Sequence, residues 1–333
     1  MMARLLAAGD LHYRGTSPRA RLDDFPATLR VKLREVFGLA KDYGCDGIVL
    51  TGDIVDTPGI ALPTLVDLCL ILAESPCPVY AVPGNHDLWG GNPETVDRTP
   101  YGALAKFRLI RDLHIHTYEV GGVFLTGHGY DSVTDRDLSQ YAPRERKSPA
   151  VHVAHGMLLL HEPRHPLIRY SLARDVAALA NAPDVLIVGH EHSGFGMVRI
   201  GRTTFVNPGA LCRLSATAEE MNRQVKVCLI DVSPGVYSGD TVAVETKLIP
   251  LQSARPAAEV FSRDHLQPLS QVRIRTGDFV ALLKAGDRIR VLDTREIVEF
   301  VAKQQGASRE VVEEALKRLA EASEQAFYTS SLL

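Results

Sequence analysis

Five short, largely apolar runs, each followed by a cluster of polar residues, constrain the fold of this 333-residue chain more than any other feature of its sequence. Runs of this length and composition are typical of strands buried on both faces. Between the first two runs, Leu29, Leu33 and Val36 recur at helical spacing, while Pro26 suits a first helical turn and Gly44 a helix end. The pattern therefore predicts an α/β fold. The five predicted strands span residues 4–8, 47–50, 79–82, 151–154 and 185–188.

The pattern changes after residue 196 to short extended segments, which are typical of a second, more antiparallel sheet. A capping box at Asp293 and a second start at Ser308 predict two helices near the end of the chain. At this length we expect one large domain, residues 1–250, and a small C-terminal region, residues 251–333, with a cap and a helical tail. The extended segments are residues 197–200, 203–206, 225–231 and 241–249, with one further strand at 272–274.

A predicted helix at residues 63–74 is apolar on most of its sides. Such a helix is either packed within the core or part of a subunit contact, and core packing is the favoured interpretation. A subunit contact would make the chain a homodimer.

Composition excludes several classes of protein. With 45% hydrophobic and 23% charged residues, the chain is not disordered or collagen-like. Its apolar runs fall well short of the about 20 residues that a membrane-spanning helix needs, so no membrane partner is expected. Five cysteines, an odd number and mostly in apolar surroundings, predict free buried thiols in a cytoplasmic protein. A net charge of -3 leaves nucleic-acid binding to a local basic patch or to metal ions.

The polar clusters follow the predicted strands, where open α/β sheets place ligand sites. In Asp10-Leu11-His12 and His190-Glu191-His192, side chains two apart point the same way on an extended segment and can reach one ion or an adjacent pair. Carboxylate, amide and imidazole ligands without cysteine suit Mn, Fe or Zn. The clusters are Asp10-Leu11-His12, Gly52-Asp53-Ile54-Val55-Asp56, Gly84-Asn85-His86-Asp87, His155-Gly156 and Gly189-His190-Glu191-His192.

Taken singly, each cluster is also explained without chemistry, since Asp10 suits the end of a strand and Gly84-Asn85 suits a turn. Five such clusters in order favour a site for two divalent ions. Two ions roughly 3.5–4 Å apart can activate a hydroxide and stabilise charge that develops on a phosphoryl group.

The ordered set of clusters resembles the calcineurin-like metallophosphoesterase superfamily over residues 4–210. This resemblance implies two facing mixed β-sheets flanked by helices. It also implies that Asp53 bridges two ions, that His86 faces the scissile phosphate as a general acid or hydrogen-bond donor, and that Asp87 orients His86. The implied ligands are Asp10, His12, Asp53 and His192 for one ion, and Asp53, Asn85, His155 and His190 for the other.

Within the superfamily the chain is most similar to the SbcD-type DNA repair nucleases, exonuclease or endonuclease subunits that work with an SMC-like ATPase. The similar segments are residues 52–58, 207–215 and 247–256. This resemblance implies a manganese-dependent nuclease whose terminal helix pair docks on the ATPase, although a generic surface hairpin explains that pair equally well. Relatives commonly pair through helices that follow the second and third strands, which implies a homodimer.

Basic residues near two of the clusters are candidates for contact with a phosphate backbone. Arg14, Arg19 and Arg21 follow the first cluster, and a second group, Arg144, Arg146 and Lys147, precedes the fourth. Ordinary solvated loops explain both groups about as well. Three functions therefore remain open, in this order: a metal-dependent DNA nuclease, a small-substrate phosphodiesterase or phosphatase acting on a nucleotide or phosphoprotein, and a non-catalytic metal-bearing scaffold.

Overall fold

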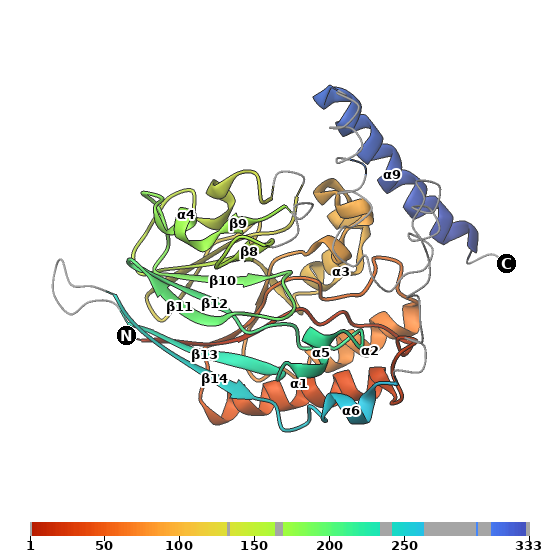
Figure 1. Cartoon of the computed structure of the whole chain (residues 1–333), viewed down its shortest axis with the longest axis horizontal. Coiled ribbons are helices and arrows are strands. Elements are labelled where there is room, and N and C mark those ends of the chain that lie inside the picture. The colour runs from red at the N-terminus through yellow and green to blue at the C-terminus, as the bar shows by residue number, and fades with distance from the viewer. Residues whose placement is uncertain are drawn as a thin grey trace.

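Two six-stranded sheets face each other, with helices on their outer faces, in a computed structural model of the chain (Figure 1). The structure describes residues 2–131, 134–163, 169–233, 242–262, 298 and 308–330. The predicted α/β fold with two facing mixed sheets flanked by helices is confirmed. The first sheet has the order β14-β13-β1-β2-β3-β4 and comprises β1 (Ala3–Ala8), β2 (Gly47–Leu50), β3 (Val79–Ala81), β4 (Arg111–Asp112), β13 (Lys226–Ser233) and β14 (Ala243–Pro250).

The second sheet has the order β11-β12-β10-β7-β6-β5. Its central strands β12, β10, β7 and β6 are parallel, and an antiparallel strand closes each edge. A small two-stranded sheet pairs β8 with β9. The bounds are β5 (Tyr118–Val120), β6 (Val123–His128), β7 (Ala150–His155), β8 (Leu158–Leu159), β9 (Ser171–Leu172), β10 (Val185–Gly189), β11 (Gly196–Ile200) and β12 (Thr203–Asn207).

The long helix α1 (Phe25–Asp42) begins and ends where the sequence predicts. The carboxylate of Asp24 caps its first turn by accepting from the N–H of Ala27, and Gly44, just beyond its end, has a φ of 63°. Among the described residues, the other α-helices are α2 (Leu62–Leu72), α3 (Pro100–Lys106), α4 (Ala173–Ala177), α5 (Ala218–Asn222), α6 (Ala257–Val260) and α9 (Arg309–Ser330), and the 3-10 helices are η1 (Asn85–Asp87), η2 (Trp89–Gly91), η3 (Pro93–Arg98) and η4 (Leu138–Tyr141).

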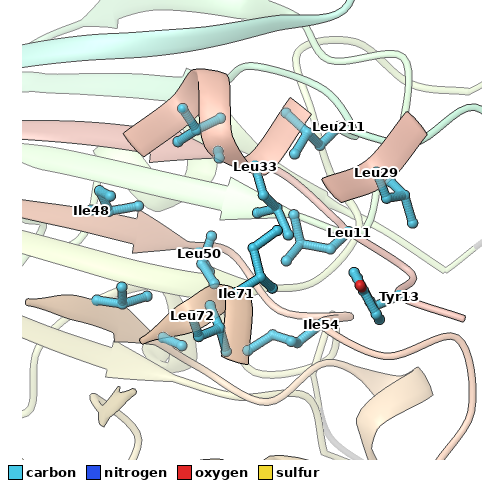
Figure 2. Packing of buried hydrophobic residues seen from close by; sticks show 14 of the residues in the cluster. Leu11, Tyr13, Leu29, Leu33, Ile48, Leu50, Ile54, Ile71, Leu72 and Leu211 are labelled. Carbon is cyan, nitrogen blue, oxygen red and sulfur yellow. The ribbon is translucent and has the colours of Figure 1, made fainter. Parts of the chain in front are cut away.

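Alternation along β1 divides the core into two layers. Leu5 and Ala7 pack between the two sheets, whereas Leu6 and Ala8 join the cluster beneath α1 and α2. Figure 2 shows part of this second cluster, with side chains from α1, α2 and the strands packed together. Because β1 is buried on both faces, Asp10 and His12, which follow it, are also buried.

The helix predicted at residues 63–74 is buried on one face only. Leu68 and Ile71 of α2 are buried, whereas Leu62, Val66 and Leu70 are exposed by 71%, 48% and 66%. Core packing therefore explains the apolar residues on the inner face of α2, whereas Leu62, Val66 and Leu70 form an exposed apolar stripe on its outer face.

The segments after residue 196 do form antiparallel pairs, β11 with β12 and β13 with β14, but they do not make up one second sheet as the sequence suggested. β11 and β12 extend the second sheet, whereas β13 pairs antiparallel with β1 and so belongs to the first sheet. Short extended segments do not reveal this division, because the chain crosses between the sheets in residues 208–225 without regular strand structure.

The C-terminal predictions are only partly within the described residues. α9 begins directly after Ser308, as predicted, while the strand at 272–274 and most of the helix from Asp293 lie outside the described part of the chain. All five cysteines are free. None of the helices among the described residues combines the length and apolar character that a membrane-spanning helix requires.

Candidate metal centre

The polar clusters meet at the carboxyl ends of the central strands, because β1, β2 and β3 are parallel in one sheet and β7 and β10 are parallel in the other. The main chain ties them to one another: the N–H groups of Leu11 and His12 donate to the carbonyl of Asp53 at 3.1 and 2.8 Å. The N–H of His190 donates to Oδ1 of Asp10 at 3.0 Å and so joins the two sheets. The structure therefore brings together all seven predicted ligands.

The first group comprises Asp10, His12, Asp53 and His192, whose ligand atoms all lie within 4.8 Å of one another. Nε2 of His12 lies 3.1 Å from Nε2 of His192 and 3.5 Å from Oδ2 of Asp53. Oδ2 of Asp10 is fully buried and has no hydrogen-bond partner among the residues that the structure describes. A buried carboxylate oxygen without a donor is costly unless a cation meets it, so these residues fit a divalent ion.

The second group comprises Asp53, His155 and His190, with Asn85 beside them. Oδ1 of Asn85 lies 3.2 Å from Nε2 of His155 and 3.0 Å from Nδ1 of His190. Nδ1 of His155 donates to the carbonyl of Thr51 at 2.7 Å, which leaves Nε2 facing the group. Because Asp53 belongs to both groups, its carboxylate is placed to bridge two ions.

The electrostatics of the second group also fit a cation. Burial lowers the pKa of His155, but the Asp53 and Asp10 carboxylates outweigh burial and raise it to about 9. The histidines in turn hold the pKa of Asp53 well below its usual range despite the desolvation of that carboxyl. The raised pKa of His155 shows that its surroundings favour positive charge, as expected where a cation binds.

Three of these residues have strained backbones. His12, Asp53 and His190 have φ values of 45°, 47° and 86°, in the left-handed region that side chains other than glycine rarely adopt. Such strain persists only where the surrounding structure enforces it, and it commonly marks functional sites. Each of the three side chains is thereby turned into the cluster.

His86 lies at the rim of the cluster and is exposed. Its main-chain N–H donates to Oδ1 of Asp53 at 2.8 Å, and Nδ1 of its ring donates to the carbonyl of Asp56 at 2.9 Å. Desolvation opposes the charged ring, but Asp53, Asp56 and Asp87 together raise the pKa of His86 above its ordinary value. The ring is therefore held with Nε2 free to carry a proton.

Asp87 does not hold the His86 ring, contrary to the orienting role considered from the sequence. Its buried carboxylate accepts from the main-chain N–H groups of Gly84, Val55 and Ile54 at 2.8, 2.9 and 3.2 Å. Asp87 thus fastens the loop after β3 to the loop after β2, and it positions His86 only through the main chain.

The profile of the calcineurin-like phosphoesterase family matches residues 3–194, more than half of the chain and the part that carries all seven ligands. The chain belongs to this family. The family consists of metal-dependent phosphoester hydrolases that typically bind two divalent ions, in agreement with the two ligand groups.

Solved structures with a similar fold include several phosphoesterases. The Thermus thermophilus protein TT1561 is 17% identical, with a TM-score of 0.42 over 68% of this chain and 94% of its own. A dimetal phosphatase from Danio rerio is 12% identical, with a TM-score of 0.44 over 74% and 98%. The calcineurin-like phosphoesterase YfkN from Bacillus subtilis is 11% identical, with a TM-score of 0.45 over 75% and 90%. No curated protein matches.

Asp56 is a residue of this phosphoesterase site that the sequence reasoning did not assign. Its Oδ1 lies 3.4 Å from Nδ1 of His12, and its Oδ2 pairs with Arg14 at 2.9 Å. Together with its carbonyl contact to His86, these interactions let one residue orient a metal ligand, an arginine and the rim histidine. Its position three residues after Asp53, in the same cluster, is the only sequence signal for this role.

The basic residues proposed to contact substrate differ in their placement. Arg14 lies beside Asp56 at the edge of the phosphoesterase site with a partly exposed side chain, and Arg19 is exposed. Arg21 is buried, pairs with Asp23 at 2.7 Å and packs over the ring of Phe25. The prediction that Arg21 contacts substrate is therefore wrong, because its guanidinium is buried in contact with Asp23 and Phe25.

The second basic group is also divided. Arg146 pairs with Asp184 at 2.7 Å and donates to the carbonyl of Ala182, at the amino end of β10. Arg144 and Lys147 are exposed. The amino end of a parallel strand lies opposite the metal-ligand edge of the sheet, so Arg146 serves that end of the fold.

Proposed function

We propose that this chain is a metal-dependent phosphodiesterase and that its substrate is DNA, cleaved as an exonuclease or endonuclease in repair. The observation that carries the proposal is the pair of ligand groups sharing Asp53, with His86 exposed beside them. An exposed histidine beside buried ligands lets a phosphate group of a long strand approach the ligands from the surface.

The residues divide the chemistry between them. When bound, the two ions would activate water and stabilise the charge that develops on the phosphoryl group. Asp10, His12, Asp53 and His192 would hold one ion, and Asp53, Asn85, His155 and His190 the other.

The role of His86 is proton transfer. Its Nδ1–H is held by the carbonyl of Asp56, and its raised pKa favours a proton on Nε2, which is donated to the oxygen of the leaving group. Asp56 keeps the ring in this orientation, and Arg14, which pairs with Asp56, would contact a phosphate oxygen.

The similarity of residues 52–58, 207–215 and 247–256 to SbcD-type nucleases supports DNA as the substrate, with manganese as the metal and an SMC-like ATPase as the partner. Arg14, Arg19 and Arg144 remain available to a phosphate backbone, whereas Lys147 packs over the ring of Phe124 near the start of β6. The buried face of α9 already contacts η2 of its own chain, so the ATPase would bind its outer side. A cytoplasmic location and a homodimer through the apolar stripe of α2 belong to the same proposal.

A small phosphodiester or phosphomonoester is the second candidate substrate. Arg21 and Arg146 are engaged in internal ion pairs, so the basic surface is smaller than the sequence predicts. A small substrate needs only the ions, His86 and Arg14.

The deciding experiment uses metal-free protein reloaded with Mn²⁺ and incubated with end-labelled linear DNA, with Asp53→Ala as the control. Manganese-dependent cleavage that disappears in the control supports the nuclease. Hydrolysis of bis(p-nitrophenyl) phosphate without DNA cleavage, in the presence or absence of an SMC-like ATPase, would instead favour the small substrate. Failure to hydrolyse either substrate, with metal bound, would leave the scaffold reading.

Replacement of His86 tests its role. We expect His86→Ala to retain both ions and to lower turnover by about 10²–10⁴-fold, the usual contribution of a positioned acid. Metal content is measured by elemental analysis and turnover with the model diester. Full activity, or loss of an ion, would remove His86 from the proton-transfer role.

A further inference from the structure

The segment of residues 210–213, called the strap here, lies directly behind two ligands of the first metal group. The N–H of Ala210 donates to the carbonyl of His192 at 3.0 Å, and the N–H groups of Leu211 and Cys212 donate to the carbonyl of Asp10 at 3.0 and 3.4 Å. All four strap residues are buried. The backbone position of Asp10 and His192 therefore depends on where the strap lies.

The carbonyls of the strap accept from cationic side chains. Nζ of Lys32, on α1, donates to the carbonyl of Leu211 at 2.7 Å. Arg223 donates to the carbonyl of Ala210 at 2.6 Å and also to that of Cys212, and Arg21 donates to that of Arg213 at 3.2 Å. Four consecutive carbonyls outside any regular element thus accept from three basic side chains, and the two guanidiniums form charge-assisted hydrogen bonds.

Lys32 is unusual for a helix residue on the core side. It is only 2% exposed, and Figure 2 shows its helical neighbours Leu29 and Leu33 within the apolar cluster that also contains Leu211. Burial lowers the pKa of its ammonium to about 7. A methionine would fill the same space without this desolvation cost, so packing alone does not explain an amine at this position.

The counter-charges do not balance the cations fully. Arg21 pairs with Asp23 and Arg223 with Glu220 at 3.0 Å, whereas Lys32 donates to the carbonyl of Leu211. A buried carbonyl is a weaker partner than a carboxylate, which indicates that the strap, rather than an ion pair, is what Lys32 serves.

We propose that Lys32 and Arg223 are positioning residues for the first metal ion: through the strap they hold Asp10 and His192 at the spacing that binds it. The second group depends on the strap less directly, because Asn85 and His155 lie on other segments and only His190 is linked to it, through its N–H bond to Oδ1 of Asp10. This inference rests on the metal-dependent function proposed above.

The test measures metal binding rather than catalysis. Metal-free protein is titrated with Mn²⁺ by calorimetry and followed by electron paramagnetic resonance. We expect the unmodified protein to bind two ions. In Lys32→Met, and in the milder Arg223→Lys, the affinity of one site for Mn²⁺ should fall by about 10–100-fold, as for other residues that orient metal ligands. The coupled two-ion signal should give way to that of a single ion.

Two further variants make the result specific. Arg146→Gln is the matched control, since Arg146 also holds a main-chain carbonyl and a carboxylate but at the other end of the sheet, and it should leave both ions bound. In a His12→Ala background, which already lacks a ligand of the first group, Lys32→Met should not weaken the remaining ion. Equal weakening of both ions, or unchanged binding of both, in folded Lys32→Met and Arg223→Lys would overturn the inference. Absence of metal binding in the unmodified protein would overturn the proposed function itself.

Discussion

Replacement of Asp87 with asparagine distinguishes a residue that fastens two loops from one that tunes His86. The carboxylate accepts three main-chain N–H groups, two of them on Oδ2 and one on Oδ1. An asparagine keeps one acceptor oxygen, so at best it retains the bonds to Gly84 and Ile54 and turns its amide against the N–H of Val55. The variant thus loses one hydrogen bond and leaves two buried donors, the N–H of Val55 and the amide of the asparagine, facing each other without an acceptor. Together these changes cost about 2–5 kcal/mol of unfolding free energy, a large part of a typical stability of about 5–15 kcal/mol.

The assay is urea unfolding of metal-free protein at pH 8. Burial and the neighbouring Asp53 carboxylate raise the pKa of Asp87 to about 7, so pH 8 favours the ionised carboxylate. We expect Asp87→Asn to lower the free energy of unfolding by about 2–5 kcal/mol and to reduce the affinity for both ions, since the loop carrying Asn85 and the loop carrying Asp53 are joined by these bonds. Unchanged stability together with a shifted pH profile of activity would refute the reasoning and restore the orienting role.

Two further predictions concern stability and α9. Burial lowers the pKa of His152 to about 3 from an ordinary value near 6.5, so between these values the unfolded chain binds a proton that the folded chain does not, and stability is lost as pH falls from about 6.5 towards 3. His152→Gln should therefore reduce the slope of the unfolding free energy against pH in this range by up to about 1.4 kcal/mol per pH unit. Equal slopes in the two proteins would contradict this prediction. Ala320→Glu places a charge in the buried contact between α9 and η2 and should separate the two elements. Because Trp89, the single tryptophan, lies in η2, its fluorescence emission should then shift to longer wavelength, whereas Val311→Glu, at an exposed position of α9, should leave the emission unchanged. Identical spectra of Ala320→Glu and the unmodified protein would exclude the contact.

Strand and helix positions were predictable because apolar periodicity reports burial directly. The five buried runs became β1, β2, β3, β7 and β10, and the metal ligands follow them because carboxyl ends of parallel strands share an edge. The sequence did not reveal that β13 pairs with β1, because the partner of a strand is set by tertiary contacts between segments far apart in the chain.

Other features depend on the local backbone and on distant contacts. The left-handed φ of His12 and of Asp53 has no compositional signal, since neither residue is glycine. Arg21 reads as a surface residue by its type, yet a nearby carboxylate and two aromatic rings make its burial favourable. Lys32 offered a signal, because it occupies the apolar stripe of its helix between Leu29 and Val36.

The pairing of β1 with β13 has a consequence for how the chain acquires its structure during synthesis. One edge of β1 is covered early by β2, but the other stays open until residues 226–233 have left the ribosome. Until then Ala3 to Ala7 present unpaired N–H and C=O groups, an edge that favours association with other chains. A fragment ending at residue 194, where the family match ends, would keep every metal ligand in sequence and still lack the strand that seals its first sheet.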